Sequence, residues 1–421
     1  PMVAAAGESA TFALVALAAI MLCIAFSFSQ LTRVMPNAGS SFSWIASAFG
    51  REAGSYAAWL LLLSNYFATM TTALPAAAYT LDLFAPALAT SPFWDALVAA
   101  AWIAASTLLL FFGLRPTAFT TAIFLLAELG VVGASAVAAL LVHPAPESYA
   151  AAAQLPLPNP ALGIVTAMVL AIWMTDGWEV SAAASEEATG PPETPGRGGV
   201  VALVLTTAIL VFAMAAYLHV GSVAGFSAHQ TDAMGYVADR LGGPIWHLAI
   251  VVTVLVSTAA TLWTTVLYLS RSVFAMGRDG VLPRAVGRLD RRSMPTNALA
   301  LVFVCVTGFT LLTGFWPTAA SALNLVLSGT SVFLGMLFCL SALAAIRLLA
   351  RAREVSRWQR ILVPAFGALA LAAIIGVDIA GSDAFARAIE LGGLALGIPF
   401  AFWRGAGMRL ARPAVAGEGL P

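Results

Sequence analysis

The sequence predicts an all-α membrane protein, built as one bundle of about eleven transmembrane helices. Of the 421 residues, 61% are hydrophobic and 10% are charged, whereas soluble domains carry about 25% charged residues. Apolar stretches long enough to cross a bilayer recur along the whole chain, and arginines fall between them in alternate loops. These three observations exclude an ordinary soluble globular protein.

Each predicted span rests on the need for about 20 mainly apolar residues to cross the hydrocarbon core. The predicted spans are 10–32, 54–84, 93–113, 117–142, 161–185, 199–220, 244–275, 297–315, 318–346, 361–380 and 387–404. Between them, residues 221–243 predict an external amphipathic segment that lies across the mouth of the bundle. Residues 1–410 are expected to form a single transmembrane domain, and 411–421 a short disordered tail rich in Gly and Pro.

The arginines set the orientation. All 20 Lys and Arg positions are arginine, and with this order of spans all except Arg240 and Arg387 fall on one face. By the positive-inside rule that face is cytoplasmic, which places the C-terminus inside and predicts a multi-pass protein of the plasma or inner membrane. An odd number of spans then places Pro1 outside, so an earlier helix running outward is expected to be missing from this sequence.

The fifth span is interrupted by Thr175-Asp176-Gly177-Trp178-Glu179, called the break below. A charged side chain at membrane depth costs at least ~2.5–3.5 kcal/mol on insertion scales, so such residues usually mark a binding site or an ion path. Gly177 weakens the helix at the same point. An unwound segment is tolerated in a membrane only where it faces protein or a water-filled cavity. The break therefore indicates a transporter.

Other chemistries lack support in the sequence. A chain without lysine has no Schiff-base or phosphate-binding lysine, and Cys23, Cys305 and Cys339 lie in apolar segments without metal-ligand spacing. No catalytic constellation occurs at membrane depth. We therefore expect neither an enzyme nor a metal site, a cofactor or a nucleic-acid partner.

Three stretches, in order, resemble the amino acid–polyamine–organocation permeases. Residues 33–44 (RVMPNAGSSFSW) resemble the loop after the family's second helix, and residues 271–283 (RSVFAMGRDGVLP) its eighth helix and following loop. The break, with Glu186-Glu187 after it, resembles the sixth helix and its cytoplasmic exit. The resemblance covers residues 1 to about 404. The order of the three motifs along the chain supports it as much as each single motif does.

This resemblance implies the leucine-transporter fold, in which two inverted five-helix repeats are followed by two further helices. The first helix of each repeat is broken, and substrate binds between the breaks near the midplane. Span 161–185 would be the broken helix of the second repeat. Eleven of the twelve expected helices are present, and the family's first helix, with its glycine-rich break, is the one not found.

Candidate substrate-binding residues gather at the break. Gly177 allows unwinding that frees carbonyls for a substrate ammonium group, and Trp173 or Trp178 can close over it, with a cation–π contribution of about 1 kcal/mol. The alternative is a structural kink in which Asp176 is bonded locally and the tryptophans pack. The predicted substrate-binding set is Trp173, Thr175, Asp176, Gly177, Trp178, Asn65 and Thr258. Membrane threonines usually bond to their own helix, which is the competing interpretation for Thr258.

Two acids are candidates for coupling or gating. Glu128 lies in the middle of span 117–142, where many sodium-independent relatives are expected to carry a lysine, and it could load a proton or hold a cation. Glu179 lies three residues after Asp176, on the same face if the helix resumes. The competing interpretation of Glu128 is a protonated structural carboxyl that is hydrogen-bonded to a neighbouring helix.

The predicted function is secondary active transport of an amino acid by alternating access, driven by protons or by exchange. The alternatives are a polyamine or organic amine carrier of the same superfamily, and a non-transporting membrane sensor or scaffold. The expected partners are a small-molecule substrate, a proton or counter-substrate, and membrane lipids, whose anionic headgroups suit the arginines between 347 and 360.

Overall fold

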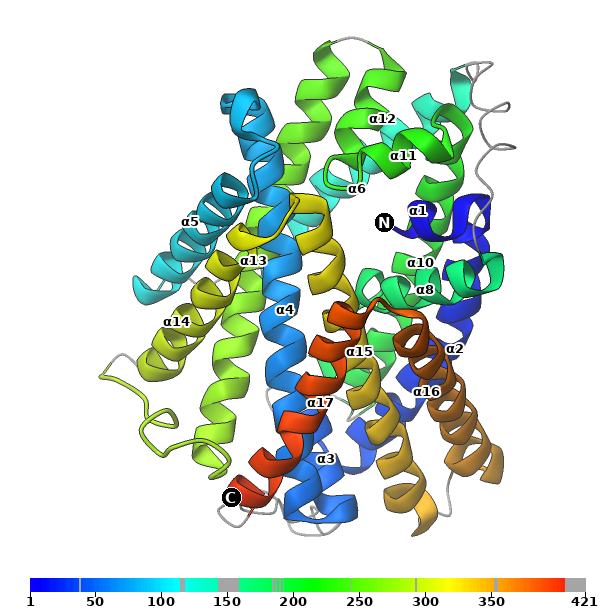
Figure 1. Cartoon of the computed structure of the whole chain (residues 1–421). Coiled ribbons are helices and arrows are strands. Elements are labelled where there is room, and N and C mark those ends of the chain that lie inside the picture. Colours follow the sequence, from blue (N-terminus) through cyan, green and yellow to red (C-terminus); the bar gives the residue numbers. More distant parts are fainter. Residues whose placement is uncertain are drawn as a thin grey trace.

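The structure is a computed structural model in which the chain folds as one bundle of helices (Figure 1). It describes residues 1–37, 39–113, 118–142, 159–183, 185, 188, 191, 193–242, 244–291, 294–351 and 355–405. The predicted tail 411–421 and Glu186-Glu187 lie outside the described residues. The all-helical fold class predicted from composition is confirmed.

The helices of the first half are α1 (Met2–Ala6), α2 (Ala10–Val34), α3 (Ser40–Phe49), α4 (Arg51–Phe84), α5 (Pro92–Phe111) and α6 (Ala118–Leu141). Those of the second half are α8 (Pro160–Met174), α9 (Val180–Ala183), α10 (Thr194–Val220), α11 (Val223–Ala228), α12 (Ala233–Leu241), α13 (Pro244–Arg278), α14 (Thr296–Leu312) and α15 (Ala319–Leu348). Two further helices follow, α16 (Val363–Gly381) and α17 (Ala384–Gly405).

Ten helices among the described residues are long and apolar enough to cross a membrane. The eleventh predicted span, 161–185, is not among them because its first helix, α8, has only 15 residues before the chain unwinds. The difference between ten and about eleven is therefore the break itself. Within the predicted external segment 221–243, the structure places two short helices, α11 and α12.

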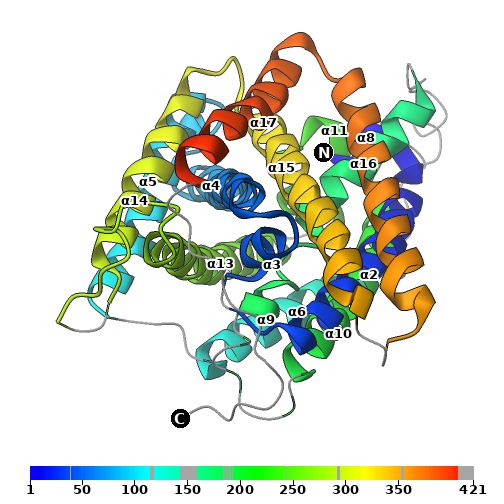
Figure 2. The same ribbon diagram turned by 90° about the horizontal axis from the view of Figure 1, so that it is seen from below.

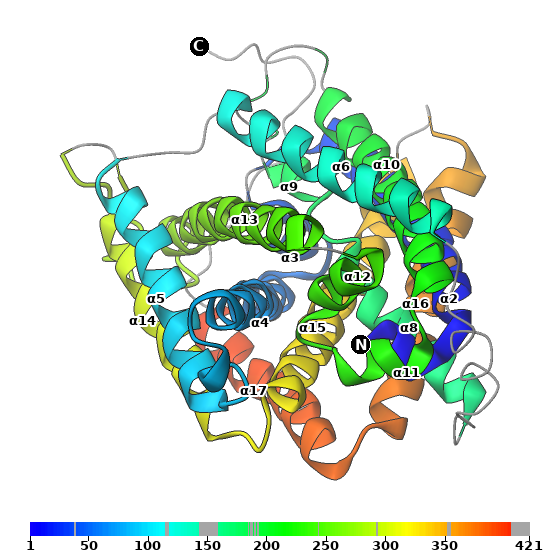
Figure 3. The same ribbon diagram turned by 90° about the horizontal axis from the view of Figure 1, so that it is seen from above.

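Three helices of the first half pack against helices of the second half in the same order along the chain. Helix α2 packs against α10, α4 against α13, and α5 against α14. Viewed along the bundle from either end, α4 and α13 run side by side through the middle (Figures 2 and 3). Helices α11 and α12 lie at one end of the bundle and α3 at the other, here called the α12 end and the α3 end.

Arginines gather at the α3 end. Arg33 and Arg347 lie in the last turns of α2 and α15, Arg51 begins α4, and Arg404 ends α17, all at this end (Figure 1). These four arginines therefore lie on one face of the bundle, as the predicted order of spans requires. The assignment of the α3 end to the cytoplasm stays a prediction.

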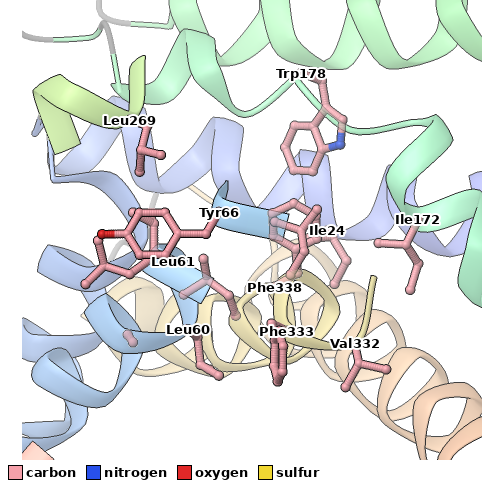
Figure 4. Packing of buried hydrophobic residues seen from close by; sticks show 14 of the residues in the cluster. Ile24, Leu60, Leu61, Tyr66, Ile172, Trp178, Leu269, Val332, Phe333 and Phe338 are labelled. Atoms are coloured by element: carbon pink, nitrogen blue, oxygen red, sulfur yellow. The ribbon is translucent and has the colours of Figure 1, made fainter. Parts of the chain in front are cut away.

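A core of large aromatic residues fills the bundle next to α3. Trp44, Phe28, Phe333 and Phe338 are among the largest fully buried side chains. The indole of Trp44 donates a hydrogen bond to the carbonyl of Met35 at 2.9 Å, which ties α3 to the end of α2. Figure 4 shows Trp178, from the break, pointing into this cluster toward Phe338. The break is therefore attached to the core of the bundle.

Candidate functional site

The break separates α8 from α9 where the sequence predicts it. Helix α8 ends at Met174, and helix α9 begins at Val180. Between them Gly177 has φ +98°, a left-handed conformation in which a residue with a Cβ atom is strained. A Cβ atom on Gly177 would meet no heavy atom within 4 Å, so the glycine is required by backbone conformation and not by crowding.

Thr175 closes the end of α8. Its hydroxyl donates to the carbonyls of Ala171 at 2.9 Å and Ile172 at 3.3 Å, and the side chain is buried. This is the local bonding that membrane threonines favour. In this conformation the hydroxyl of Thr175 is bonded to α8, and Thr175 caps the helix directly before the chain unwinds.

The two acids of the break lie together. Oε2 of Glu179 accepts a hydrogen bond from the amide of Gly177 at 3.0 Å, and the carboxyl groups of Asp176 and Glu179 interact with each other. Oδ1 of Asp176 is buried without a hydrogen-bond partner among the described residues. Like charges this close repel, so a bound proton or a cationic ligand relieves the pair. The arrangement suits a cation or a transferable proton.

Tyr268 of α13 completes this polar cluster, although the sequence interpretation missed it. Its hydroxyl is hydrogen-bonded to Ser272 and lies within electrostatic range of both Asp176 and Glu179. No spacing in the sequence connects residue 268 with residue 176. The available signal is a single tyrosine inside a span that also carries several hydroxyl residues.

Trp178 anchors the break by packing. It is 4% exposed, and its ring lies 5.0 Å from that of Phe28 and 5.3 Å from that of Phe338. Aromatic pairs of this kind contribute about 0.5–1.5 kcal/mol beyond the area they bury. Trp173 lies half-buried against the same core. Closure of either ring over a substrate stays a prediction.

Helix α10 approaches the break closely. A Cβ atom on Gly199 would lie 2.8 Å from the carbonyl oxygen of Trp178, and one on Gly196 would lie 2.6 Å from Cα of Ser29. No side chain fits at either position without movement of the backbone. The two glycines hold the break between α2 and α10, and sequence reasoning did not single them out.

The other predicted binding residues are bonded within their own helices. Nδ2 of Asn65 donates to the carbonyl of Leu61 at 2.9 Å on α4, and the hydroxyl of Thr258 donates to the carbonyl of Val254 on α13. No described hydrogen bond joins either side chain to the break. Their role in binding stays a prediction.

Glu128 lies apart from the break on α6. It is half-buried, and no described hydrogen bond or ion pair joins it to another described residue. The side chains of Phe119 and Leu126 on the same helix are exposed by 74% and 68%. Of the two acids predicted to act in coupling, Glu179 therefore interacts with Asp176, whereas no such contact of Glu128 is described.

Comparisons with known proteins agree with this architecture. The family model described as "Amino acid permease" matches residues 1–398. The branched-chain amino acid permease BcaP of Lactococcus lactis is 26% identical over 326 residues, which cover 72% of this chain and 69% of the relative. The amino acid permease YecA of Bacillus subtilis, itself of uncharacterized function, is 24% identical over 375 residues, or 88% and 83% of the two chains.

Two further similarities are narrower, one covering part of the chain and the other showing the fold alone. An arginine/ornithine antiporter of Pseudomonas aeruginosa is 25% identical over 162 residues, 37% of this chain and 33% of the relative. The solved structure of a manganese transporter of Eremococcus coleocola superposes with a TM-score of 0.59 at 14% identity, covering 96% of this chain and 90% of that one. The latter shows the fold and confirms the predicted transporter-like bundle. Since the family model covers nearly the whole chain, the protein belongs to the amino acid permease family, within the amino acid–polyamine–organocation superfamily.

Proposed function

We propose that this protein is a secondary transporter that moves an amino acid across the plasma or inner membrane by alternating access. The observation that carries the proposal is the break, where two interacting carboxyls and a left-handed glycine interrupt a helix inside an apolar bundle. Family membership and the relatives named as amino acid permeases support amino acids as the substrate class. The α3 end and the C-terminus would face the cytoplasm.

The break offers an ammonium group two kinds of acceptor. The carbonyls at the end of α8 accept hydrogen bonds from Thr175 and Asp176, and they lie at the negative end of the helix dipole, where a second lone pair can accept from a ligand. Asp176 adds a carboxylate oxygen that is buried and unpaired among the described residues. A substrate amine bound here would gain charge-assisted hydrogen bonds that water cannot supply at this depth. Trp173, Trp178, Asn65 and Thr258 would border the rest of the substrate.

The driving force would come from a proton or a counter-substrate. The Asp176–Glu179 pair can hold one proton between two carboxyls, and its position next to the substrate lets binding and protonation influence each other. A ligand shifts the balance between outward-open and inward-open states only by its difference in affinity for them. Glu128, on a separate helix, remains a second candidate for coupling.

Uptake and exchange in liposomes test this proposal. The reconstituted protein would be assayed with a panel of labelled amino acids and amines, with and without an inward proton gradient. We expect Asp176→Asn to lower the initial rate at least about tenfold, equivalent to about 1.4 kcal/mol. We expect Glu179→Gln to preserve exchange but to abolish stimulation by the gradient.

Asp95→Asn is the matched control. Asp95 on α5 is 3% exposed and also has an unpaired carboxyl oxygen, but it lies far from the break in the sequence and on a different helix. Loss of transport in Asp95→Asn but not in Asp176→Asn would contradict the site assignment. Saturable binding without uptake or exchange would instead favour the sensor or scaffold alternative.

Transport of polyamines or other organic amines is the second candidate. The Asp176–Glu179 pair favours it, since two adjacent carboxyls suit a cationic ligand. The partial match to an arginine/ornithine antiporter points in the same direction. Selective uptake of agmatine or putrescine over neutral amino acids would identify this function.

A further inference from the structure

His247 lies where three helices meet at the α12 end of the bundle. It belongs to the first turn of α13, against which α12 packs (Figure 3). Its Nε2 lies 3.5 Å from Oδ2 of Asp82 in the last turn of α4, and its Nδ1 lies 3.4 Å from Oδ1 of Asp239 near the end of α12. One imidazole ring therefore joins α12 to α4 and α13. We call these three side chains the His247 junction.

The geometry of the junction suits a charged ring. A neutral imidazole has one N–H group and one nitrogen with a lone pair, whereas the protonated ring donates from both nitrogens. In the neutral form, one nitrogen of His247 would therefore place its lone pair opposite a carboxylate oxygen. Protonation replaces this repulsion with a second attractive contact, so both aspartates are bound at once only by the cationic ring.

The junction is in contact with water. The side chains of His247 and Asp82 are 33% and 34% exposed, and that of Asp239 is 71% exposed. A histidine ordinarily gains or loses its proton between about pH 5 and 8. Aspartates near water ordinarily keep their charge over that range. A change of pH near neutrality therefore acts on the junction through the imidazole ring.

Two further titratable groups of this region interact with the junction or lie beside it. Asp232, the N-cap of α12, interacts electrostatically with Asp82, His229 and His247. Burial raises the pKa of Asp232 to about 6, so this acid also titrates near neutrality. The hydroxyl of Tyr79 on α4 accepts a hydrogen bond from the first turn of α12 and interacts with Asp232. An experiment on His247 must therefore compare two proteins at one pH.

No arginine competes for the two aspartates among the described residues. Arg240 follows Asp239 directly, but its Nε donates to the carbonyl of Val220 at 3.0 Å, and no ion pair to it is described. Helices α5 and α6 also pack against α13 and carry Asp95 and Glu128, and no described electrostatic interaction joins either acid to His247. Helix α14, which packs there too, has no charged residue. The described counter-charge of Asp82 and Asp239 is therefore the ring of His247.

We propose that His247 attaches α12 to α4 in a pH-dependent way: the protonated ring binds Asp82 and Asp239 together, and loss of the proton weakens the attachment. The junction lies at the end of the bundle predicted to face outside. Acid on that side would hold α12 against α4 and α13, and neutral pH would loosen it. The proposal does not depend on which substrate the break binds.

Hydrogen exchange of the α12 amides tests the proposal, measured by mass spectrometry on the full-length protein in detergent. The unaltered protein and His247→Gln are compared with each other at pH 5.5 and again at pH 8, so that the direct effect of pH on exchange cancels. At pH 5.5 we expect the α12 amides to exchange about threefold to fivefold faster in His247→Gln, because two partly exposed ion pairs are lost. At pH 8 we expect the two proteins to differ by less than about twofold.

His219→Gln is the matched control. His219 lies in the last turn of α10, and no described ion pair includes it. We expect this variant to leave exchange in α12 unchanged at both pH values. The double variant His247→Gln/Asp82→Asn should exchange about as fast at pH 5.5 as His247→Gln alone, since the two side chains act through one contact.

Three outcomes would overturn the proposal. Equal acceleration by His247→Gln at both pH values would show that the ring acts by packing and not by its charge. Unchanged exchange at pH 5.5, or the same acceleration in His219→Gln, would show that the junction does not hold α12. If His247→Gln does not fold, Asp82→Asn supplies the test, with a larger acceleration expected at pH 5.5 than at pH 8. An acceleration by Asp82→Asn that is the same at both pH values would also overturn the proposal.

Discussion

The break and the outer segment (residues 221–242, with α11 and α12) are two irregular parts of this protein that are attached to the bundle in different ways. The break contains polar residues but is fixed by packing, through Trp178 in the aromatic core and through α10 at Gly199. The outer segment has a small apolar core of its own, in which Phe226 and Val237 are buried, and side-chain hydrogen bonds attach it to α4 and α15. Its amide at Met234 donates to the hydroxyl of Tyr79 at 3.0 Å, and its Gln230 accepts from Asn324 at 3.0 Å.

This difference has a physical consequence. Close-packed interiors resist small changes of volume, whereas polar contacts near solvent open at low cost and respond to pH. A transporter that alternates between two states needs a fixed site and a movable closure. We therefore expect the break to be sensitive to side-chain volume and the outer segment to be sensitive to charge.

The largest expected effect is that of Trp178→Ala. Removal of a large buried aromatic side chain leaves a cavity and costs about 3–5 kcal/mol. The measurement is the free energy of unfolding in detergent, followed by thermal or denaturant titration. Trp316→Ala is the control, because Trp316 is only half-buried, just before the start of α15. Its loss is expected to cost less than about 1 kcal/mol. Equal losses would show that the break is not held by its aromatic anchor.

The next effect is expected at Gly199 on α10. A methyl group there meets the carbonyl of Trp178 and the hydroxyl of Ser181, so Gly199→Ala should destabilise by about 1–3 kcal/mol. The adjacent Gly198 has open space at its Cβ position, and Gly198→Ala should instead stabilise the helix by about 0.5–1 kcal/mol. Opposite signs in thermal unfolding would confirm the close approach. Equal changes in both variants would contradict it.

Gly177→Ala separates strain from crowding at the same site. The Cβ position is open, so the cost comes from the left-handed backbone alone and is about 1–2 kcal/mol. Gly376 on α16 also has open space but lies within a regular helix, and Gly376→Ala should be stabilising. A neutral Gly177→Ala would mean that the break does not adopt this turn. Transport assays of the same variant report whether the turn also matters for function.

The sequence allowed the break to be predicted because charge and glycine coincide within one apolar span. It did not reveal that Trp178 packs against Phe28 and Phe338, since these contacts join residues more than a hundred positions apart. Asp378 and Glu390 were missed although each is an acid inside a predicted span, the same signal that identified Asp176. Gly376 and Gly392 lie two residues from these acids but within helices, and only the fold brings α16 and α17 to the hydroxyls of Thr166 on α8 and Ser328 on α15.

The smallest expected effect is a dependence on pH in the outer segment. Asp232 begins α12, where its Oδ1 accepts from the amide of Gly235 at 3.1 Å. Burial, together with the neighbouring Asp82 carboxyl, raises the pKa of Asp232 to about 6. Its unfolded pKa is about 3.9, so protonation favours the folded form. The resulting stability is fully present below about pH 4 and is lost as the pH rises through about 6.

Because Asp232 is partly exposed, we expect this contribution to be no more than about 1 kcal/mol after screening. Unfolding measured between pH 4 and 7 should show the decline in the unaltered protein and a flatter profile in Asp232→Asn, which retains an N-cap acceptor. Glu52→Gln, an exposed acid at the α3 end, should leave the profile unchanged. A decline that persists in Asp232→Asn would show that Asp232 is not its source. A flatter profile would assign the decline to the N-cap of α12, a polar contact of the outer segment, and not to the aromatic packing that holds the break at Trp178.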